Sequence, residues 1–336
     1  MRSDEPDLKK SSIAAPSGTN IRGYLLIAAA TLFWGASATL GKAVFIGLIG
    51  AGRDNISKLD PLILAQSRTA ISLLILAPIL FFARRKNGVR LPGRDALRCM
   101  WLGVVGLAVS NFMYYYAIEK TSVATAIVLQ YTAPVWVLCY MIARRIQRPT
   151  AARVAAVAMA VVGIALAVGT LGFRAGIPHL RPDFKLNLPG LMAAQMAALS
   201  FAFYNIYGRS LIEVHDRWKV LLYALIGVTL FWLLINPPWK IIAAHYTRQQ
   251  WAFLTLFAVS SMLLPFSLYF SGLRYLDPTR AIVTSCLEPI FAILFAAGFV
   301  RETLDGAQFL GVAIVLAGTM LVQLPEKRKL ESELAI

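Results

Sequence analysis

The sequence predicts an all-α integral membrane protein with ten transmembrane helices arranged as two inverted five-helix repeats. Three observations lead to this fold class. The 336 residues are 58% apolar and only 15% charged, with a mean hydropathy of +0.65. This exceeds the ~45–50% apolar content of ordinary globular domains. Long apolar runs recur along the chain, and the chain resembles itself at an offset of 155 residues.

Apolar runs long enough to cross a bilayer, which takes ~20 residues, define the expected spans. We place them at 23–47, 61–83, 96–117, 122–143, 151–171, 188–211, 218–235, 251–273, 279–300 and 304–324. The connections are short, and the longest are 48–60 and 172–187. The first run is too long for the hydrophobic region of a signal peptide, so we expect it to be retained as a span.

These spans predict a first five-helix repeat over 22–171, an outer linker over 172–187 and a second five-helix repeat over 188–324. Residues 1–21 and 325–336 are polar and charged. We expect these two segments to be disordered cytoplasmic ends, because they hold too few apolar side chains to bury.

The basic residues predict the orientation of the chain. Lys and Arg number 33 against 17 Asp and Glu, a net charge of +16. With the N-terminus inside, 22 basic residues fall in inner segments and 9 in outer ones, while Lys42 and Arg68 lie within spans. This bias predicts a multi-pass protein of the cell membrane with both termini in the cytoplasm. Because topology accounts for the charge, we expect no nucleic-acid partner.

The internal repeat rests on matches 155 residues apart over three consecutive spans, among them Pro134 with Pro289. Since each unit holds an odd number of spans, the second copy must enter the membrane in the opposite orientation, as in many secondary transporters. Both prolines fall near mid-bilayer and free the carbonyl groups of Gln130 and Ser285. Such paired interruptions mark a midplane site or are kinks inherited by duplication, and both interpretations stay open.

Ionisable groups inside the hydrocarbon are candidates for function, because leaving them unpaired there costs several kcal/mol. Arg68 and Glu288 are the deepest. One hypothesis is that Glu288 binds a proton or a substrate amine, with a proton affinity that depends on whether Arg68 is near. The alternative is a static pair that only joins helices. Lys42 lies near the outer end of its span, where a lysine can also extend to the interface.

Polar and aromatic residues within spans are candidates for the wall of a cavity, although such residues also crosslink helices. The candidates for substrate binding or coupling, besides the three charged residues, are Trp34, Asn111, Tyr114, Gln130, Tyr204, Asn205 and Ser285. Pro134 and Pro289 are candidates for gating kinks. Tyr131 and Tyr269 belong to the wider set of polar residues within spans. An amide flanked by rings, as at Asn205, suits a zwitterion with an apolar tail.

Short motifs stand near the start, middle and end of the chain: Trp34-Gly35, Lys42, Arg68, Ala126 to Pro134, Leu287-Glu288-Pro289 and Arg301-Glu302. In order and spacing they resemble the drug/metabolite transporter superfamily, in its ten-helix EamA-like branch, over about residues 22–324. The resemblance implies an inner-membrane secondary carrier of small metabolites, commonly an exporter of amino acids or related compounds. Gln147 departs from the pattern, because Glu302 stands at the matching place in the second repeat.

The sequence carries no signal for a metal or a cofactor. The three histidines and three cysteines are scattered, and no Walker A loop, Gly-rich dinucleotide turn or His-Glu-x-x-His motif is present. We therefore expect no metal, no cofactor and no enzyme activity. The expected partners are a small-molecule substrate, the lipid bilayer and a coupling proton or ion, with monomer and homodimer both open.

The leading prediction is a secondary transporter that works by alternating access. A passive channel or a lipid scramblase is the alternative. A membrane-embedded lipid-modifying enzyme is less favoured, because it would need clustered acidic or histidine residues at one interface. Substrate identity, transport direction and the coupled ion stay open at this point.

Overall fold

The computed structural model describes residues 21–45, 61–83, 88–120, 123–174, 177–180, 187–243, 245–299 and 305–323. The expected cytoplasmic ends therefore lie outside the described residues, apart from Ile21. The described chain is mostly helical, as the composition predicted. It also holds one antiparallel hairpin of two short strands, β1 (Leu171–Arg174) and β2 (Ile177–Leu180), which the sequence did not predict.

The first part of the chain, which we call the first half, covers residues 21–169. Its elements are α1 (Ile21–Phe45), α2 (Pro61–Ala83), α3 (Gly93–Trp101), the π-helical segment η2 (Leu102–Ala108), α4 (Val109–Lys120), α5 (Val123–Gln130), α6 (Ala133–Ala143) and α7 (Ala151–Ala167). The helix α2 has the bounds of an expected span, because the whole apolar run folds as one helix.

The second half covers residues 188–323. Its elements are α8 (Leu188–Val214), α9 (Arg217–Ile235), α10 (Pro238–Ala243), α11 (Arg248–Ala258), the π-helical segment η3 (Val259–Leu263), α12 (Leu264–Leu273), α13 (Pro278–Ser285), α14 (Leu287–Phe299) and α15 (Gly306–Gln323). The short helix α10 lies in a stretch that was expected to be a loop. Over the described residues each expected span falls on a helix or on consecutive helices, except that the span expected over 151–171 leaves its helix after Ala167 and reaches β1 at Leu171.

Length and composition alone qualify three described helical stretches to cross a membrane: Gly93–Tyr114, Arg217–Ile235 and Arg248–Leu273. Shorter apolar helices cover Ile21–Ser37, Gln66–Phe82, Ala133–Ala143, Ala151–Ala167 and Gly306–Val322. The expected spans at 122–143 and 279–300 are both interrupted, which is why neither forms one long helix.

The two interruptions stand at matching places in the two halves. α5 ends at Gln130 and α6 begins at Ala133, while α13 ends at Ser285 and α14 begins at Leu287. A proline follows each break within the first turn of the new helix, where its missing N–H leaves no intrahelical bond unmade. The bounds of α5 and α13 differ by 155 residues at both ends, the same offset as the sequence matches.

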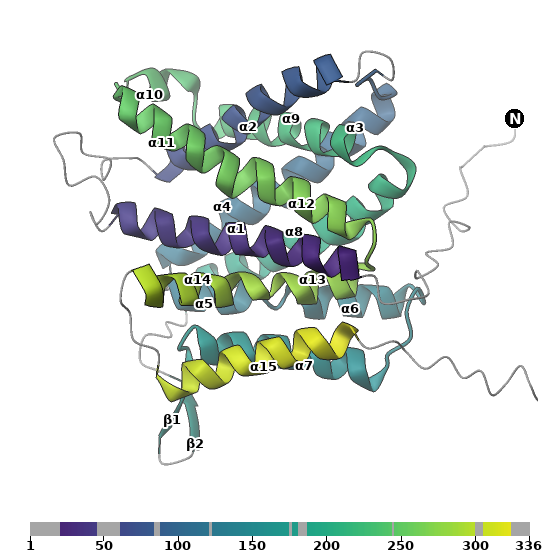
Figure 1. Cartoon of the computed structure of the whole chain (residues 1–336), viewed down its shortest axis with the longest axis vertical. Coiled ribbons are helices and arrows are strands. Elements are labelled where there is room, and N and C mark those ends of the chain that lie inside the picture. Colours follow the sequence, from purple (N-terminus) through teal and green to yellow (C-terminus); the bar gives the residue numbers. More distant parts are fainter. Residues whose placement is uncertain are drawn as a thin grey trace, which may run out of the picture.

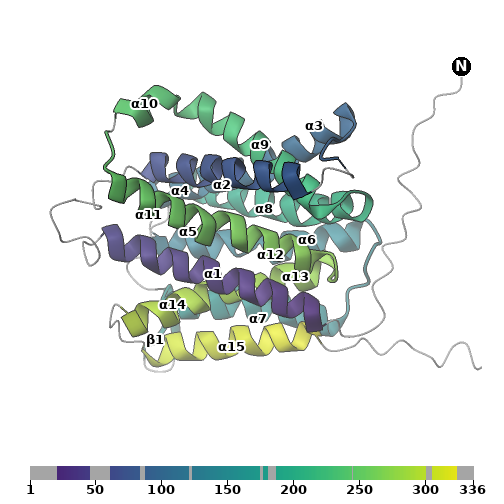
Figure 2. The same cartoon turned by 45° about the horizontal axis from the view of Figure 1, so that its top comes forward.

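The helices run roughly side by side (Figure 1). Helices α7 and α15 pack together at one edge, and α2, α3 and α9 pack at the other. Between these edges, α1 lies against α12 and α14 in both views (Figures 1 and 2). Close approach depends on glycine at the α7–α15 contact, since a Cβ on Gly311 would lie 2.6 Å from the Gly163 carbonyl oxygen. Such small-residue contacts are typical of membrane helices.

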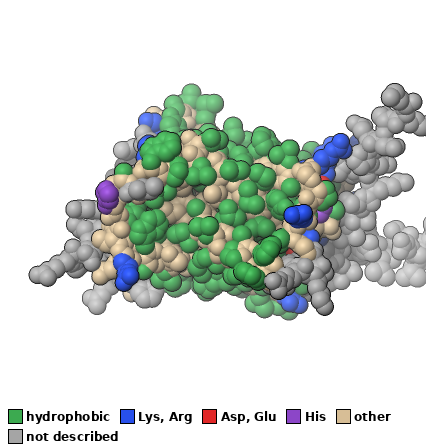
Figure 3. Space-filling view, turned by 90° about the horizontal axis from the view of Figure 1, so that it is seen from above, with side chains coloured by type: hydrophobic (Ala, Val, Ile, Leu, Met, Phe, Trp, Pro, Cys, Tyr) green, Lys and Arg blue, Asp and Glu red, His purple; other side chains and the backbone are tan. Residues whose placement is uncertain are grey.

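The outer surface of the bundle is apolar along its middle. Large hydrophobic side chains such as Leu74, Phe82, Leu234 and Met320 are mostly exposed. Seen from above, hydrophobic side chains cover the centre of the face, and Lys and Arg side chains gather toward its two ends (Figure 3). This distribution matches the hydrocarbon core and the two interfaces of a bilayer, so the structure supports a multi-pass membrane location.

Candidate functional site

The two deepest charges of the sequence interact electrostatically inside the bundle. Glu288 lies in the first turn of α14, directly after the break in the second half, and its side chain is partly buried. Tyr131 lies in the matching break of the first half and hydrogen-bonds to the Glu288 side chain. Arg68, from α2, interacts electrostatically with the Glu288 carboxylate. Tyr114 on α4 lies close to Tyr131. We call Arg68, Tyr114, Tyr131 and Glu288 the charged centre.

The guanidinium of Arg68 retains unused hydrogen-bonding capacity. Its Nε atom is buried and has no hydrogen-bond partner among the described residues. A buried donor without a partner is costly, typically by about 1–3 kcal/mol, unless a ligand or water satisfies it. Arg68 therefore presents a donor without a described partner, within electrostatic reach of the Glu288 carboxylate.

A second group of side chains lies next to the charged centre and is mostly aromatic. The indole of Trp34 on α1 contacts two rings of α12, with centroid distances of 4.9 Å to Phe266 and 5.4 Å to Tyr269. The ring of Tyr204 on α8 lies 6.0 Å from Phe266 and 6.4 Å from Tyr269. We call Trp34, Tyr204, Phe266 and Tyr269, with Asn205 and Ser285, the aromatic group.

Polar atoms within the aromatic group are tied to one another. The Tyr269 hydroxyl donates to the Asn205 side-chain oxygen, and the Asn205 amide donates to the Phe201 carbonyl at 2.8 Å. Ser285, the last residue of α13, lies within hydrogen-bonding reach of the Tyr269 hydroxyl. The Tyr204 hydroxyl is buried without a hydrogen-bond partner among the described residues. The group thus combines large flat rings with a few fixed polar atoms, which is typical of ligand sites.

The break between α13 and α14 joins the two groups. Ser285 stands on one side of it and Glu288 on the other, while Cys286 in the break interacts with both Glu288 and Tyr269. A change in the angle between α13 and α14 would therefore move Glu288 relative to Ser285.

The remaining candidates take different places. Lys42 lies on α1, but its side chain is outside the described part of the structure. Asn111 on α4 and Gln130 at the end of α5 are partly buried, and no described contact ties them to either group. Pro134 and Pro289 are buried in the first turns of α6 and α14, beside the breaks.

Some residues of the site were not singled out from the sequence. Phe266 carries no signal that distinguishes it from other apolar residues of its span. Tyr131 was named only among the polar residues within spans, although its place three residues before Pro134 could have drawn attention to it. Thr132, in the same break, donates to Gln195 on α8 at 3.3 Å, and Trp136 donates to the same oxygen at 3.1 Å.

A groove of about 180 Å³ opens between α1, α13, α14 and α15. It is lined by Ile21, Tyr24, Leu25, Ala28, Thr284, Leu287 and Thr319. Neither Arg68 nor Tyr269 lines this groove. Among the described residues, no three His, Cys, Asp or Glu side chains lie close enough together to hold a metal ion.

An apolar helical bundle with opposite charges inside it and matched helix breaks is typical of the α-helical membrane proteins among which carriers occur. Residues 21–169 and 188–324 each match the model of the EamA-like transporter family. The chain belongs to this family, and with it to the drug/metabolite transporter superfamily, as the sequence motifs predicted.

Relatives cover most of the chain. An uncharacterized inner membrane transporter of Salmonella typhimurium, YicL, is 23% identical over 93% of this chain and 98% of its own length. The threonine/homoserine exporter RhtA of Escherichia coli is 26% identical over 88% of each chain. A solved crystal structure shares the fold with a TM-score of 0.67 at 18% identity, over 89% of this chain and 96% of that one. YicL is named as a transporter and RhtA as an exporter, and together with the family match they support a permease with a small-molecule substrate.

Proposed function

We propose that the protein is a secondary transporter that exports amino acids or related small metabolites by alternating access. One observation carries this proposal: Arg68 of the first half interacts electrostatically with Glu288 of the second half, which lies directly after one of two matched helix breaks. Charges buried in a membrane protein mark substrate and ion pathways. Broken helices near the bilayer centre are where many secondary transporters bind their substrates.

The proposal includes ten membrane spans in two inverted five-helix halves. The matched bounds of α5 and α13 support a duplication, and so do the two π-helical segments, η2 and η3, which stand at corresponding places. Two halves that each contain five spans would cross the membrane in opposite directions. The basic residues of the inner segments support cytoplasmic termini.

The chemistry of the site supports a zwitterionic substrate. The free Nε donor of Arg68 suits a carboxylate, and the carboxylate of Glu288 suits an ammonium group. The rings of Trp34, Phe266 and Tyr269 offer an apolar wall for the rest of the molecule. The relative RhtA is a threonine/homoserine exporter, which supports the same substrate class.

The empty site and the substrate-bound site would then differ in the partners of the Arg68 and Glu288 charges. Without substrate, Arg68 and Glu288 attract each other across the two halves. A bound amino acid would place its own charges between them and so change the force that holds the halves together. Glu288 could alternatively bind a proton when the substrate leaves, which would couple transport to pH.

Counterflow in proteoliposomes tests the proposal, with labelled threonine as the first probe. A carrier shows trans-stimulation by internal substrate, whereas a passive channel or a lipid scramblase shows none. We expect Glu288→Gln to lower counterflow by about tenfold or more, the loss typical of a charge-assisted contact, and to remove its pH dependence. Glu213→Gln, at the end of α8, is the matched control and should leave counterflow unchanged.

The outcome that contradicts the role of Glu288 is equal counterflow in Glu288→Gln and the unaltered protein at all pH values. Absence of trans-stimulation with threonine, with homoserine and with a mixture of the other amino acids would contradict amino-acid transport itself.

A further inference from the structure

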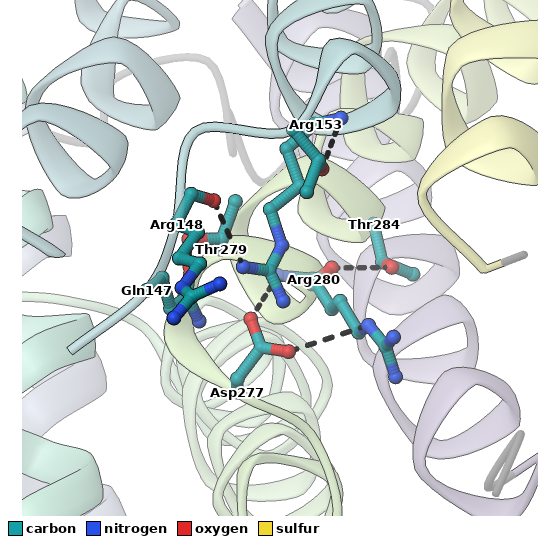
Figure 4. A network of polar contacts seen from close by, with 8 residues as sticks. Gln147, Arg148, Arg153, Asp277, Thr279, Arg280 and Thr284 are labelled. Carbon is teal, nitrogen blue, oxygen red and sulfur yellow. Dashed lines mark hydrogen bonds and ion pairs between the residues drawn. The ribbon is translucent and has the colours of Figure 1, made fainter. Parts of the chain in front are cut away.

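A buried polar network joins the two halves at one end of the bundle (Figure 4). Thr279 of the second half donates to the Gln147 side chain of the first half at 2.8 Å. The carboxylate of Asp277 points between the guanidinium groups of Arg153, from the first half, and Arg280, from the second (Figure 4). The Arg280 Nε atom lies 3.3 Å from the Asp277 Oδ2 atom. We call these five residues the inner network, because they lie at the end where the basic segments predict the cytoplasm.

Three of the five members of the network are buried, whereas Gln147 and Arg280 are partly exposed. Arg153 is 7% exposed, Asp277 is 4% exposed and Thr279 is fully buried. Tyr24 on α1, itself 5% exposed, lies close enough to interact with Arg153, Asp277 and Arg280. Separating buried opposite charges is strongly unfavourable unless water or another partner replaces the lost contacts. The halves can therefore part at this end only when the network breaks and its charges gain access to water.

Local structure holds each member in place. Asp277 is the N-cap of α13 and accepts a bond from the Arg280 backbone N–H at 3.0 Å. Arg153 lies in the first turn of α7, where it donates to the Arg148 carbonyl at 3.4 Å. The network thus ties the turn between α6 and α7 to the start of α13. The other end of α13 is Ser285, next to Glu288, and eight residues of helix span only ~12 Å.

The charges of the network have no counterpart at the matching positions of the repeat. At an offset of 155 residues, Arg153 corresponds to Gln308, Asp277 to Ser122 and Arg280 to Thr125. Gln308 donates to the Ala167 carbonyl at 3.5 Å, so this position still joins the halves, through one neutral bond. The pairing of Asp277 with two arginines is thus present in one copy only. Gln147, the remaining first-half member of the network, corresponds to Glu302, so the other copy carries a carboxylate at that position instead.

We infer that the inner network is a gate that holds the cytoplasmic end closed and must break before that end can open. The inference rests on the proposed alternating access, to which it adds an asymmetry: the repeat positions that match Arg153, Asp277 and Arg280 hold no charged residues. Because α13 connects the gate to Glu288, substrate binding at the charged centre can shift α13 and weaken the gate. An exporter needs such a link, since it loads from the cytoplasm.

The test uses Cys286, in the break beside Glu288, as a natural reporter of access. The chain has three cysteines, so replacing Cys99 and Cys139 by serine leaves only this thiol. A membrane-impermeant maleimide is applied to inside-out and to right-side-out vesicles, and the labelling rates are compared. Asp277→Asn removes the charge and keeps an N-cap residue at the start of α13.

We expect Asp277→Asn to raise cytoplasmic labelling of Cys286 by about tenfold, because a charge-assisted contact is lost from the closed state only. Thr279→Val removes one neutral bond and should give a smaller rise. Glu213→Gln is the matched control. Glu213 pairs at 2.8 Å with Arg209 of its own helix, so this ion pair does not connect the two halves. Gel-filtration profiles verify that each variant is folded.

Equal rates of Cys286 labelling in Asp277→Asn, Thr279→Val and the unaltered protein would refute the inference that the inner network is a gate. A rise from the outer face alone would overturn its assignment to the cytoplasmic end. Labelling requires neither a substrate nor transport, so the two proposals fail separately. Increased labelling without amino-acid counterflow would support the gate and refute amino acids as the substrate class. Amino-acid counterflow with unaltered labelling would support the substrate class and refute the gate.

Discussion

A single methyl group on Gly103 is expected to push two helices apart. Gly103 in η2 faces α9, and a Cβ atom built there would lie 2.0 Å from the Ala224 carbonyl oxygen and 2.9 Å from its Cα. On the facing helix, a Cβ on Gly227 would lie 2.3 Å from the Met100 carbonyl oxygen. The two glycines thus let the first and second halves touch backbone to backbone.

The size of the effect follows from these distances. Ordinary contact of a Cβ begins at 3.4 Å, so Gly103→Ala requires a local separation of about 1.4 Å. The obstructing atoms are backbone and cannot rotate away. Overpacking of this kind costs ~1–3 kcal/mol, and we take the upper value because no side chain can yield. At ~2–4 °C per kcal/mol, the apparent Tm should fall by at least about 6 °C.

The assay is thermal unfolding of purified protein in one detergent at a fixed scan rate. Gly306→Ala is the matched control, because nothing lies within 4 Å of a Cβ at that position. Gly103→Ala with Gly227→Ala should cost less than the sum of the two single changes, since one separation relieves both contacts. An apparent Tm within about 2 °C of the control would refute the close approach of η2 and α9.

Two further predictions concern buried polar contacts. The Asn236 side-chain amide donates to the Gln66 side-chain oxygen at 2.7 Å, and Gln66 is only 1% exposed. Asn236→Ala should therefore lower the free energy of unfolding by about 1–3 kcal/mol, because the buried Gln66 oxygen loses its donor. Leucine at both positions should recover most of the loss in the same melting assay. Tyr269→Phe removes the hydroxyl that donates to Asn205. It should raise the KM for counterflow by about threefold to tenfold with little change in Tm, whereas an unaltered KM would argue against the aromatic group as a substrate wall.

Much of the fold could be predicted from local sequence. Apolar runs of about twenty residues locate the helices because the bilayer sets their length, and α2 has the bounds expected for it. Pro134 and Pro289 locate the two breaks, because a proline cannot donate the backbone bond that would continue a helix. The hairpin β1–β2 and the helix α10 were not predicted, because such short elements depend on neighbours rather than on a long apolar pattern.

The candidate site was predictable only in part. Arg68 and Glu288 stand out in the sequence because each is a charge inside an apolar run, and each could be named without knowing the other's position. Their proximity, the bond from Tyr131 and the rings around Tyr269 depend on how helices pack. Phe266 could not be chosen, since its contribution is its position and not its chemistry.

The sequence by itself determined the class of protein, its family, its approximate helix positions and the two charges most in need of an explanation. These properties are local, because they depend on composition, run length and motifs along the chain. Only the tertiary structure decided which charges meet. Nothing in the sequence distinguishes Asp277 beyond its place before Pro278. Arg153 and Arg280 were counted only among the basic residues that predict the orientation of the chain. Packing brings Arg153 and Asp277, more than a hundred residues apart, into one buried network.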